Sequence, residues 1–190
     1  MKNVLLSALA ACSVMSVRAG EFQYVVSLDG PSEPTASLGI GSGTVTYDDV
    51  AHTLQLQVSF SGLTGNTTAS HLHAATTSPF SGTAGVATTT PSFAGFPLGV
   101  TSGTYSNTLD LTSASSFNPS YVTAHGGTLA GAESALAAAM AGGQAYWNIH
   151  STFANGGEIR GFLVPVPEPS TLVLLGLGAG VIGWRLRRRL

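Results

Sequence analysis

Hydrophobic and polar residues alternate along much of the chain, as they do in β-strands that bury one face. The alternation is clearest over residues 53–60, where Leu54, Leu56, Val58 and Phe60 share one face and polar residues occupy the other. The same reasoning predicts seven further strands, at residues 21–28, 44–47, 69–74, 85–90, 103–111, 144–150 and 158–164.

One short helix is expected among these strands. Residues 132–140 place Leu136 and Met140 four positions apart on one helical face, and Gly142 follows as a stop signal. Between the last two strands, the run Asn155-Gly156-Gly157 suits a hairpin turn. Many short strands with one helix predict an all-β protein, an antiparallel β-sandwich of Greek-key-like topology.

The C-terminal end has a different composition. Residues 171–184 are uncharged and mostly apolar, and they are expected to form a transmembrane helix with help from flanking residues. A basic cluster follows and predicts a stop-transfer signal held on the cytoplasmic side. Its members are Arg185, Arg187, Arg188 and Arg189.

A short motif precedes this apolar segment. Pro167, Glu168 and Pro169, then the apolar run and then the arginines resemble the bacterial PEP-CTERM sorting signal over residues 166–190. The resemblance implies that an exosortase, a membrane protease-transpeptidase, cuts near the motif. It also implies delivery to the cell surface or to an extracellular matrix after transient membrane anchoring. The alternative is a plain C-terminal membrane anchor.

The N-terminal end predicts export as well. Lys2 precedes an apolar stretch over residues 4–17, which is typical of a helical signal peptide comprising residues 1–19 and removed by signal peptidase after Ala19. A competing interpretation takes the run before Cys12 as a lipoprotein box, with Cys12 lipidated. Cys12 is the single cysteine of the chain, so no disulfide is expected to stabilise the exported domain.

Removal of both ends leaves one domain, residues 20–165, with an acidic balance. It contains a single basic residue, Arg160, against eight acidic residues, a net charge of −7 with histidine neutral. Nucleic acids are therefore excluded as partners, because the domain has no cations to displace their counterions.

Three motifs of this domain carry a second resemblance. They are the His71-Leu72-His73 run, the Tyr146-Trp147-Asn148-Ile149-His150 run and the Gly157-Glu158-Ile159-Arg160-Gly161 run. In this order they resemble the CHRD domain, a module named after the animal protein chordin. For bacterial members the resemblance implies an extracellular β domain whose biochemical role is not established.

The histidines of these motifs are candidate metal ligands. His71 and His73 lie two residues apart in a strand and project to the same side, with Leu72 opposite. If Leu72, Trp147 and Ile149 face the core, His150 lies with His71 and His73 on the outside of the sandwich. Imidazoles in this arrangement suit Zn or Cu. Copper-zinc superoxide dismutase is a similar exported β-sandwich, by fold-level analogy alone.

The alternative is that these histidines only form hydrogen bonds with strand ends and loops. Of the other histidines, His125 is a reserve fourth ligand, and His52 is expected at the surface. Structural roles are expected for Asn148, Glu158 and Arg160. We expect Arg160 to be partly buried and paired with Glu158 or Asp110, because a lone arginine among carboxylates seldom stays unpaired.

No catalytic motif stands out in the sequence, so two functions remain. The first is a non-enzymatic surface or matrix protein with a structural or adhesive role, with extracellular polysaccharide as a candidate partner. The second is a metalloprotein with Zn or Cu as its cofactor, similar to superoxide dismutase in its redox chemistry.

Overall fold

The computed structural model describes residues 20–167 of the 190-residue chain. The predicted signal helix, the apolar segment at 171–184 and the arginine cluster lie outside the described residues. No helix within the described part is long and apolar enough to cross a membrane.

Strands dominate this part of the chain, and all named strand pairs are antiparallel. The strands are β1 (Glu21–Asp29), β2 (Ile40–Asp48), β3 (Thr53–Ser61), β4 (Thr67–His73), β5 (Gly103–Asp110), β6 (Tyr146–Ser151), β7 (Ile159–Phe162) and β8 (Val164–Pro165). The helices are the 3-10 turn η1 (Ala114–Ser116), α1 (Pro119–Ala124) and α2 (Leu129–Ala141). The all-β prediction is confirmed.

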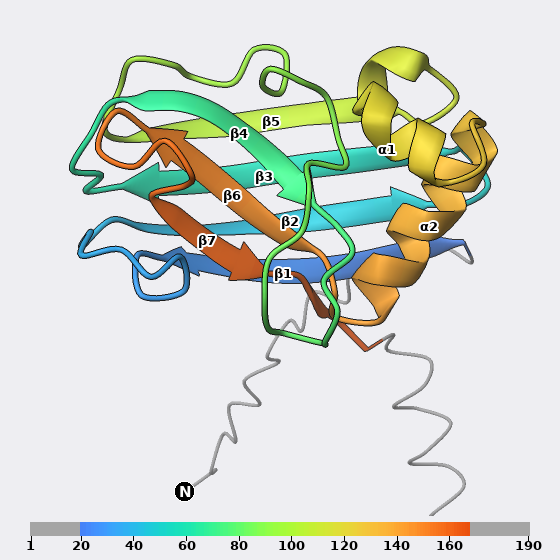
Figure 1. Ribbon diagram of the computed structural model, residues 1–190, viewed down its shortest axis with the longest axis horizontal. Coiled ribbons are helices and arrows are strands. Elements are labelled where there is room, and N and C mark those ends of the chain that lie inside the picture. The colour runs from blue at the N-terminus through green and yellow to red at the C-terminus, as the bar shows by residue number, and fades with distance from the viewer. Residues whose placement is uncertain (1–19, 168–190) are drawn as a thin grey trace, which may run out of the picture.

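The strands form one continuous sheet in the order β4-β6-β7-β1-β2-β3-β5, with β8 added beside β1. The sheet curls, so that β4, β6 and β7 cross over the face of β1, β2 and β3 (Figure 1), and one hydrophobic core joins residues of both halves. The two layers of the expected sandwich are thus two halves of a single sheet. Helix α2 covers one end of it (Figure 1).

The alternating residues of β3 supply the centre of the core. Leu54, Leu56, Val58 and Phe60 are all buried, as their spacing predicts. Trp147 of β6 is fully buried on the opposite layer, and its indole N–H donates to Ser70 Oγ over 2.7 Å, which satisfies the one polar atom of that side chain.

Two expectations about individual elements were wrong. Residues 85–90 form no strand, because only Val86 and Thr88 make isolated bridges, and the segment instead runs as a loop beside β4. Helix α1 was not expected from the hydrophobic pattern. It begins at Pro119 after Asn118, whose side chain accepts from the Ser120 amide, and a six-residue helix is too short to show a period.

The closing hairpin of β6 and β7 depends on two close backbone approaches. At Gly161 an added Cβ would overlap the Ser27 carbonyl oxygen on β1, closer than any side chain tolerates. At Gly157, where φ is +136°, a Cβ would meet the Asn148 side chain. Glycine at these positions lets the hairpin dock onto β1 and fold over Asn148.

Candidate metal centre

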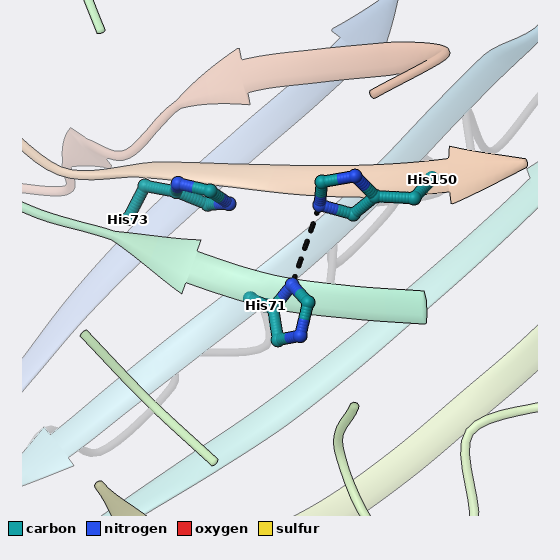
Figure 2. Close-up of side chains that lie close together, drawn as sticks. All are labelled: His71, His73 and His150. Carbon is teal, nitrogen blue, oxygen red and sulfur yellow. Dashed lines mark hydrogen bonds between the residues drawn. The ribbon is translucent and has the colours of Figure 1, made fainter. Parts of the chain in front are cut away.

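Three histidines from the neighbouring strands β4 and β6 converge on one point. His71 and His73 come from β4 and His150 comes from β6, and one ring nitrogen of each lies within 4.8 Å of the other two. His71 Nδ1 lies 3.3 Å from His150 Nε2 (Figure 2). Ala69 pairs with His150 in the ladder, so His71 is its diagonal neighbour on the same face of the sheet. Among residues 20–167, no Asp, Glu or Cys joins this group.

The histidines lie on the face opposite the core, but this face is not the outside of the molecule. Leu72, Trp147 and Ile149 point into the core and are fully buried. The exposed fractions of His71, His73 and His150 are nevertheless only 6%, 7% and 9%. The histidines are buried because connecting segments fold back over this face.

Two segments form the cover. The loop that replaces the expected strand at 85–90 follows β4, with the Ala74 amide donating to the Gly85 carbonyl and the Phe93 amide donating to the Ser70 carbonyl. The turn between β6 and β7 closes the other side, because the carbonyl of Asn155 accepts from His150. Backbone segments therefore enclose the three candidate metal ligands.

Each histidine ring is fixed by one backbone carbonyl. His71 Nε2 lies 2.7 Å from the Pro91 carbonyl oxygen, His73 Nδ1 lies 2.9 Å from that of Ala84, and His150 Nδ1 lies 2.9 Å from that of Asn155. A carbonyl only accepts, so each of these nitrogens must carry the proton. The other nitrogen of each neutral ring then presents a lone pair.

These lone pairs face one another. His71 Nδ1 and His150 Nε2 are both acceptors when the rings are neutral, so their 3.3 Å approach places two lone pairs together. His73 Nε2 is buried and has no hydrogen-bond partner. Buried polar atoms without partners are rare, and an ion that accepts three lone pairs would satisfy all of them.

Burial also keeps the rings unprotonated. It lowers the pKa of His73 to about 4, against the opposing effect of its hydrogen bond to Ala84, and the neighbouring histidines and Arg160 add to the lowering. Burial likewise lowers the pKa of His71 and of His150. Neutral imidazole is the form that ligates metals, so this environment suits metal binding at neutral pH.

Arg160 is buried as expected, but its expected partners were wrong. Its Nε donates to the Ser32 carbonyl and lies 3.1 Å from Glu33 Oε2, and its guanidinium lies 5.0 Å from the centre of the Tyr146 ring. Burial raises the pKa of Glu33, although Arg160 acts in the opposite direction. The pair holds the loop between β1 and β2 against β7.

Asp110 and Glu158 have other partners. Asp110 accepts from the amide and hydroxyl of Thr112 near the end of β5. Glu158 is fully buried, and its carboxylate accepts from two hydroxyls and two amides, those of Ser37, Ser151, Thr64 and Gly65. Burial acts to raise the pKa of Glu158, but these four hydrogen bonds outweigh it and the pKa is lowered. Glu158 thus joins the β1–β2 loop, the β3–β4 loop and the end of β6.

Asn148 lies between the histidines and Arg160. It pairs with His71 on one side and with Arg160 on the other, and its side-chain Nδ2 donates to the Gly156 carbonyl over 3.2 Å. Its Oδ1 is buried without a hydrogen-bond partner. Asn148 therefore anchors the turn that covers His150.

The two remaining histidines lie elsewhere. His125 Nδ1 lies 2.8 Å from the Tyr121 carbonyl at the end of α1, and His125 is not part of the metal candidate group. His52 is exposed, as expected, and forms two 3.0 Å contacts with the buried Glu133, which also accepts from the Tyr47 hydroxyl. Helix position alone did not indicate that Glu133 faces inward.

Comparison with known protein families supports both resemblances. The CHRD domain model matches residues 22–163, and the PEP-CTERM protein-sorting motif matches residues 165–189. No curated protein and no solved structure matches the chain. The sorting motif implies export, membrane anchoring and cleavage by an exosortase. The chain therefore belongs to the CHRD domain family and is an exported protein sorted through a C-terminal PEP-CTERM motif.

Proposed function

We propose that this protein is a cell-surface or extracellular-matrix protein whose CHRD domain binds a transition-metal ion through His71, His73 and His150. The observation that carries the proposal is the convergence of three unprotonated ring nitrogens, each on a ring whose other nitrogen donates to a backbone carbonyl. Metal-ligating histidines have this second hydrogen bond as a rule, because it fixes the tautomer and the ring orientation.

A purely structural role for the histidines fits the contacts less well. Hydrogen bonding to loops explains one nitrogen of each ring, and it leaves the partnerless Nε2 of His73 and the facing lone pairs of His71 and His150 without a reason. Two bonds of about 2.0 Å from one ion to nitrogens 3.3 Å apart enclose roughly a tetrahedral angle. The candidate ligand nitrogens of all three histidines lie within 4.8 Å of one another, so His73 would complete three-fold ligation by moving towards the other two.

The end of the domain supports the proposed surface location. Strand β8 pairs with β1, and the Val166 amide donates to the Gln23 carbonyl over 2.8 Å. The folded domain thus extends to Val166, the residue before the Pro167-Glu168-Pro169 motif. Cleavage near the motif would release the complete domain, metal site included, from its membrane segment.

Metal analysis of the protein extracted from the cell surface tests the proposal. We expect about one equivalent of Zn or Cu in the native protein and a loss of most of it in His150→Ala. The matched control is His125→Ala, which removes a histidine bonded only within α1 and should retain the metal. Equal metal content in the two variants, or none in the native protein, would refute the site.

A structural or adhesive role in a polysaccharide matrix is the second candidate. The observation that favours it is a groove of ≈ 460 Å³ between α2 and the sheet, lined by the rings of Phe22, Tyr24 and Tyr47 beside Glu133 and His52. Aromatic rings next to hydrogen-bonding side chains offer an apolar face and a polar edge, which a sugar ring requires.

Co-sedimentation with the polysaccharide of the producing cells tests this second role. Phe22→Ala should weaken binding, because Phe22 is a half-exposed ring of the groove that stacks on Tyr47. Phe153→Ala removes a similarly exposed ring on the turn after β6 and serves as the control. Equal retention of both variants would exclude the groove as the sugar site.

A further inference from the structure

The ligand set of the metal centre is electrically neutral. All three candidate ligands are imidazoles, and no carboxylate or thiolate among residues 20–167 belongs to the group. The nearby charged side chain is a cation, Arg160, whose guanidinium lies 5.0 Å from the centre of the Tyr146 ring, and the His73 ring stacks on that same ring. No ligand charge would therefore offset the charge of an ion bound here.

The burial of the site makes that charge costly. The three histidines are at most 9% exposed, and their cover consists of backbone segments. The idealised cost of moving an ion from water to a protein interior rises with the square of its charge. A divalent ion thus loses about four times as much hydration as a monovalent ion and has no anionic ligand to offset the loss.

Arg160 increases the difference in binding free energy between a divalent and a monovalent ion. It lies on the neighbouring strand β7, separated from His71 only by Asn148 in the cross-strand ladder. Its repulsion of a bound ion is proportional to the ion's charge, so a divalent ion is repelled twice as strongly as a monovalent one. Glu33 offsets this repulsion in part, because it pairs with Arg160 at 3.1 Å.

We propose that the site selects monovalent copper, Cu(I), over Zn(II). This inference rests on the proposed metal-binding function and specifies its ion. Three neutral imidazoles suit copper, and a d¹⁰ monovalent ion accepts low coordination numbers, so it requires neither an anionic ligand nor a bound hydroxide. Ag(I), with the same charge and electron count, should occupy the site too.

Competition titrations of the full chain in detergent test the selectivity. The metal-free protein is titrated without oxygen against a coloured Cu(I) chelator, and separately against a coloured Zn(II) chelator at the same pH. We expect one equivalent of Cu(I) bound at least about a hundredfold more tightly than Zn(II). Zn(II) binding of equal or greater strength would overturn the selectivity and leave the metal site intact. Failure of both ions to bind would overturn the site itself.

Variants of Arg160 test the electrostatic reason. Arg160→Gln should tighten Zn(II) binding more than Cu(I) binding and so reduce the affinity ratio, whereas Arg160→Lys keeps the charge and should preserve it. Glu33→Gln removes the offsetting anion and should enlarge the ratio, which provides a test if Arg160→Gln does not fold. A ratio that is the same in Glu33→Gln and the native protein would refute the contribution of Arg160.

Discussion

The Nδ1 of His71 lies 3.3 Å from the Nε2 of His150, across the pairing of two neighbouring strands. Backbone carbonyls take the only proton of each neutral ring, so neither nitrogen has a hydrogen to offer the other. This arrangement costs free energy in the metal-free domain. It also means that metal loading should stabilise the fold, because the ion binds the native state alone.

The histidines should make the metal-free domain sensitive to mild acid. Their pKa values are lowered in the fold, that of His73 to about 4, so below pH 6.5 the unfolded chain binds protons that the native state refuses. The free energy of unfolding should therefore fall as the pH drops from 6.5 towards 4. Urea denaturation of chelator-treated protein measures it.

Substitution of His73 isolates this contribution. His73→Gln should reduce the slope between pH 4.5 and 6 by about 1.4 kcal/mol per pH unit, the value for one proton. The control is His52→Gln. Glu133 raises the pKa of His52, so His52 is protonated in both states over that range and the slope should not change. An unaltered slope in His73→Gln would contradict the neutral, buried state of this ring.

Arg160 should contribute to stability through burial rather than through exposed charge. Arg160→Ala should lower the free energy of unfolding by about 2 to 4 kcal/mol, because it leaves Glu33 and the Ser32 carbonyl without their partner. An exposed pair would contribute about 1 kcal/mol or less. Denaturant melts distinguish the two outcomes.

The pH dependence of this loss identifies the partner. Burial raises the pKa of Glu33 against the lowering effects of Arg160 and, to a smaller extent, Asn148, so the pKa should rise further in Arg160→Ala. When the pKa of a carboxyl is higher in the native state than in the unfolded chain, the free energy of unfolding falls as the pH rises through that pKa. The destabilisation should thus be greater at pH 8 than at pH 5. Equal losses at both values would assign the effect to packing alone.

Local sequence patterns predict the strands and the facing of their residues, but not what covers them. The parity of Leu72, Trp147 and Ile149 places the three histidines on the opposite face, as the structure has them. Their burial depends on the loop beside β4, whose path is set by contacts such as the Phe93 amide with the Ser70 carbonyl. Such long-range contacts leave no period in the sequence.

The partners of buried charges are hard to predict for the same reason. Glu33 lies in a loop far from Arg160 in the chain, whereas Glu158 is two residues away and looked more plausible. Glu158 instead turns to hydroxyls and amides of three separate segments. Only the pairing of β7 with β1 brings the loop after β1 to Arg160.

Gly161 should be intolerant of any side chain. The Cβ of an alanine here would overlap the Ser27 carbonyl on β1, which is backbone and cannot move aside as a flexible side chain could. Gly161→Ala should lower the free energy of unfolding by about 3 kcal/mol or more, through strain and separation of β7 from β1. Gly156→Ala, with open space around its Cβ, is the control and should change stability by less than about 1 kcal/mol. Similar melts for both variants would show that β7 moves away at little cost.

The tail should be cut after the folded domain rather than retained as an anchor. Exosortase processing is expected near Pro167-Glu168-Pro169, and the pairing of β8 with β1, continued by the bond from the Val166 amide to Gln23, keeps the chain through Val166 within the fold. A protease needs an extended, accessible chain, so the new C-terminus should lie at Pro167 or beyond. Intact-mass measurement of surface-extracted protein gives its position.

Glu168→Gln, which removes the acidic residue of the motif, should leave uncut chains, whereas Ser170→Ala should be processed normally. Removal of residues 185–190 should impair membrane retention during sorting, because the stop-transfer arginines are then missing. If native chains ending at Leu190 were recovered from cells with an active exosortase, the tail would be a permanent anchor, and the domain would act at the membrane rather than in the matrix.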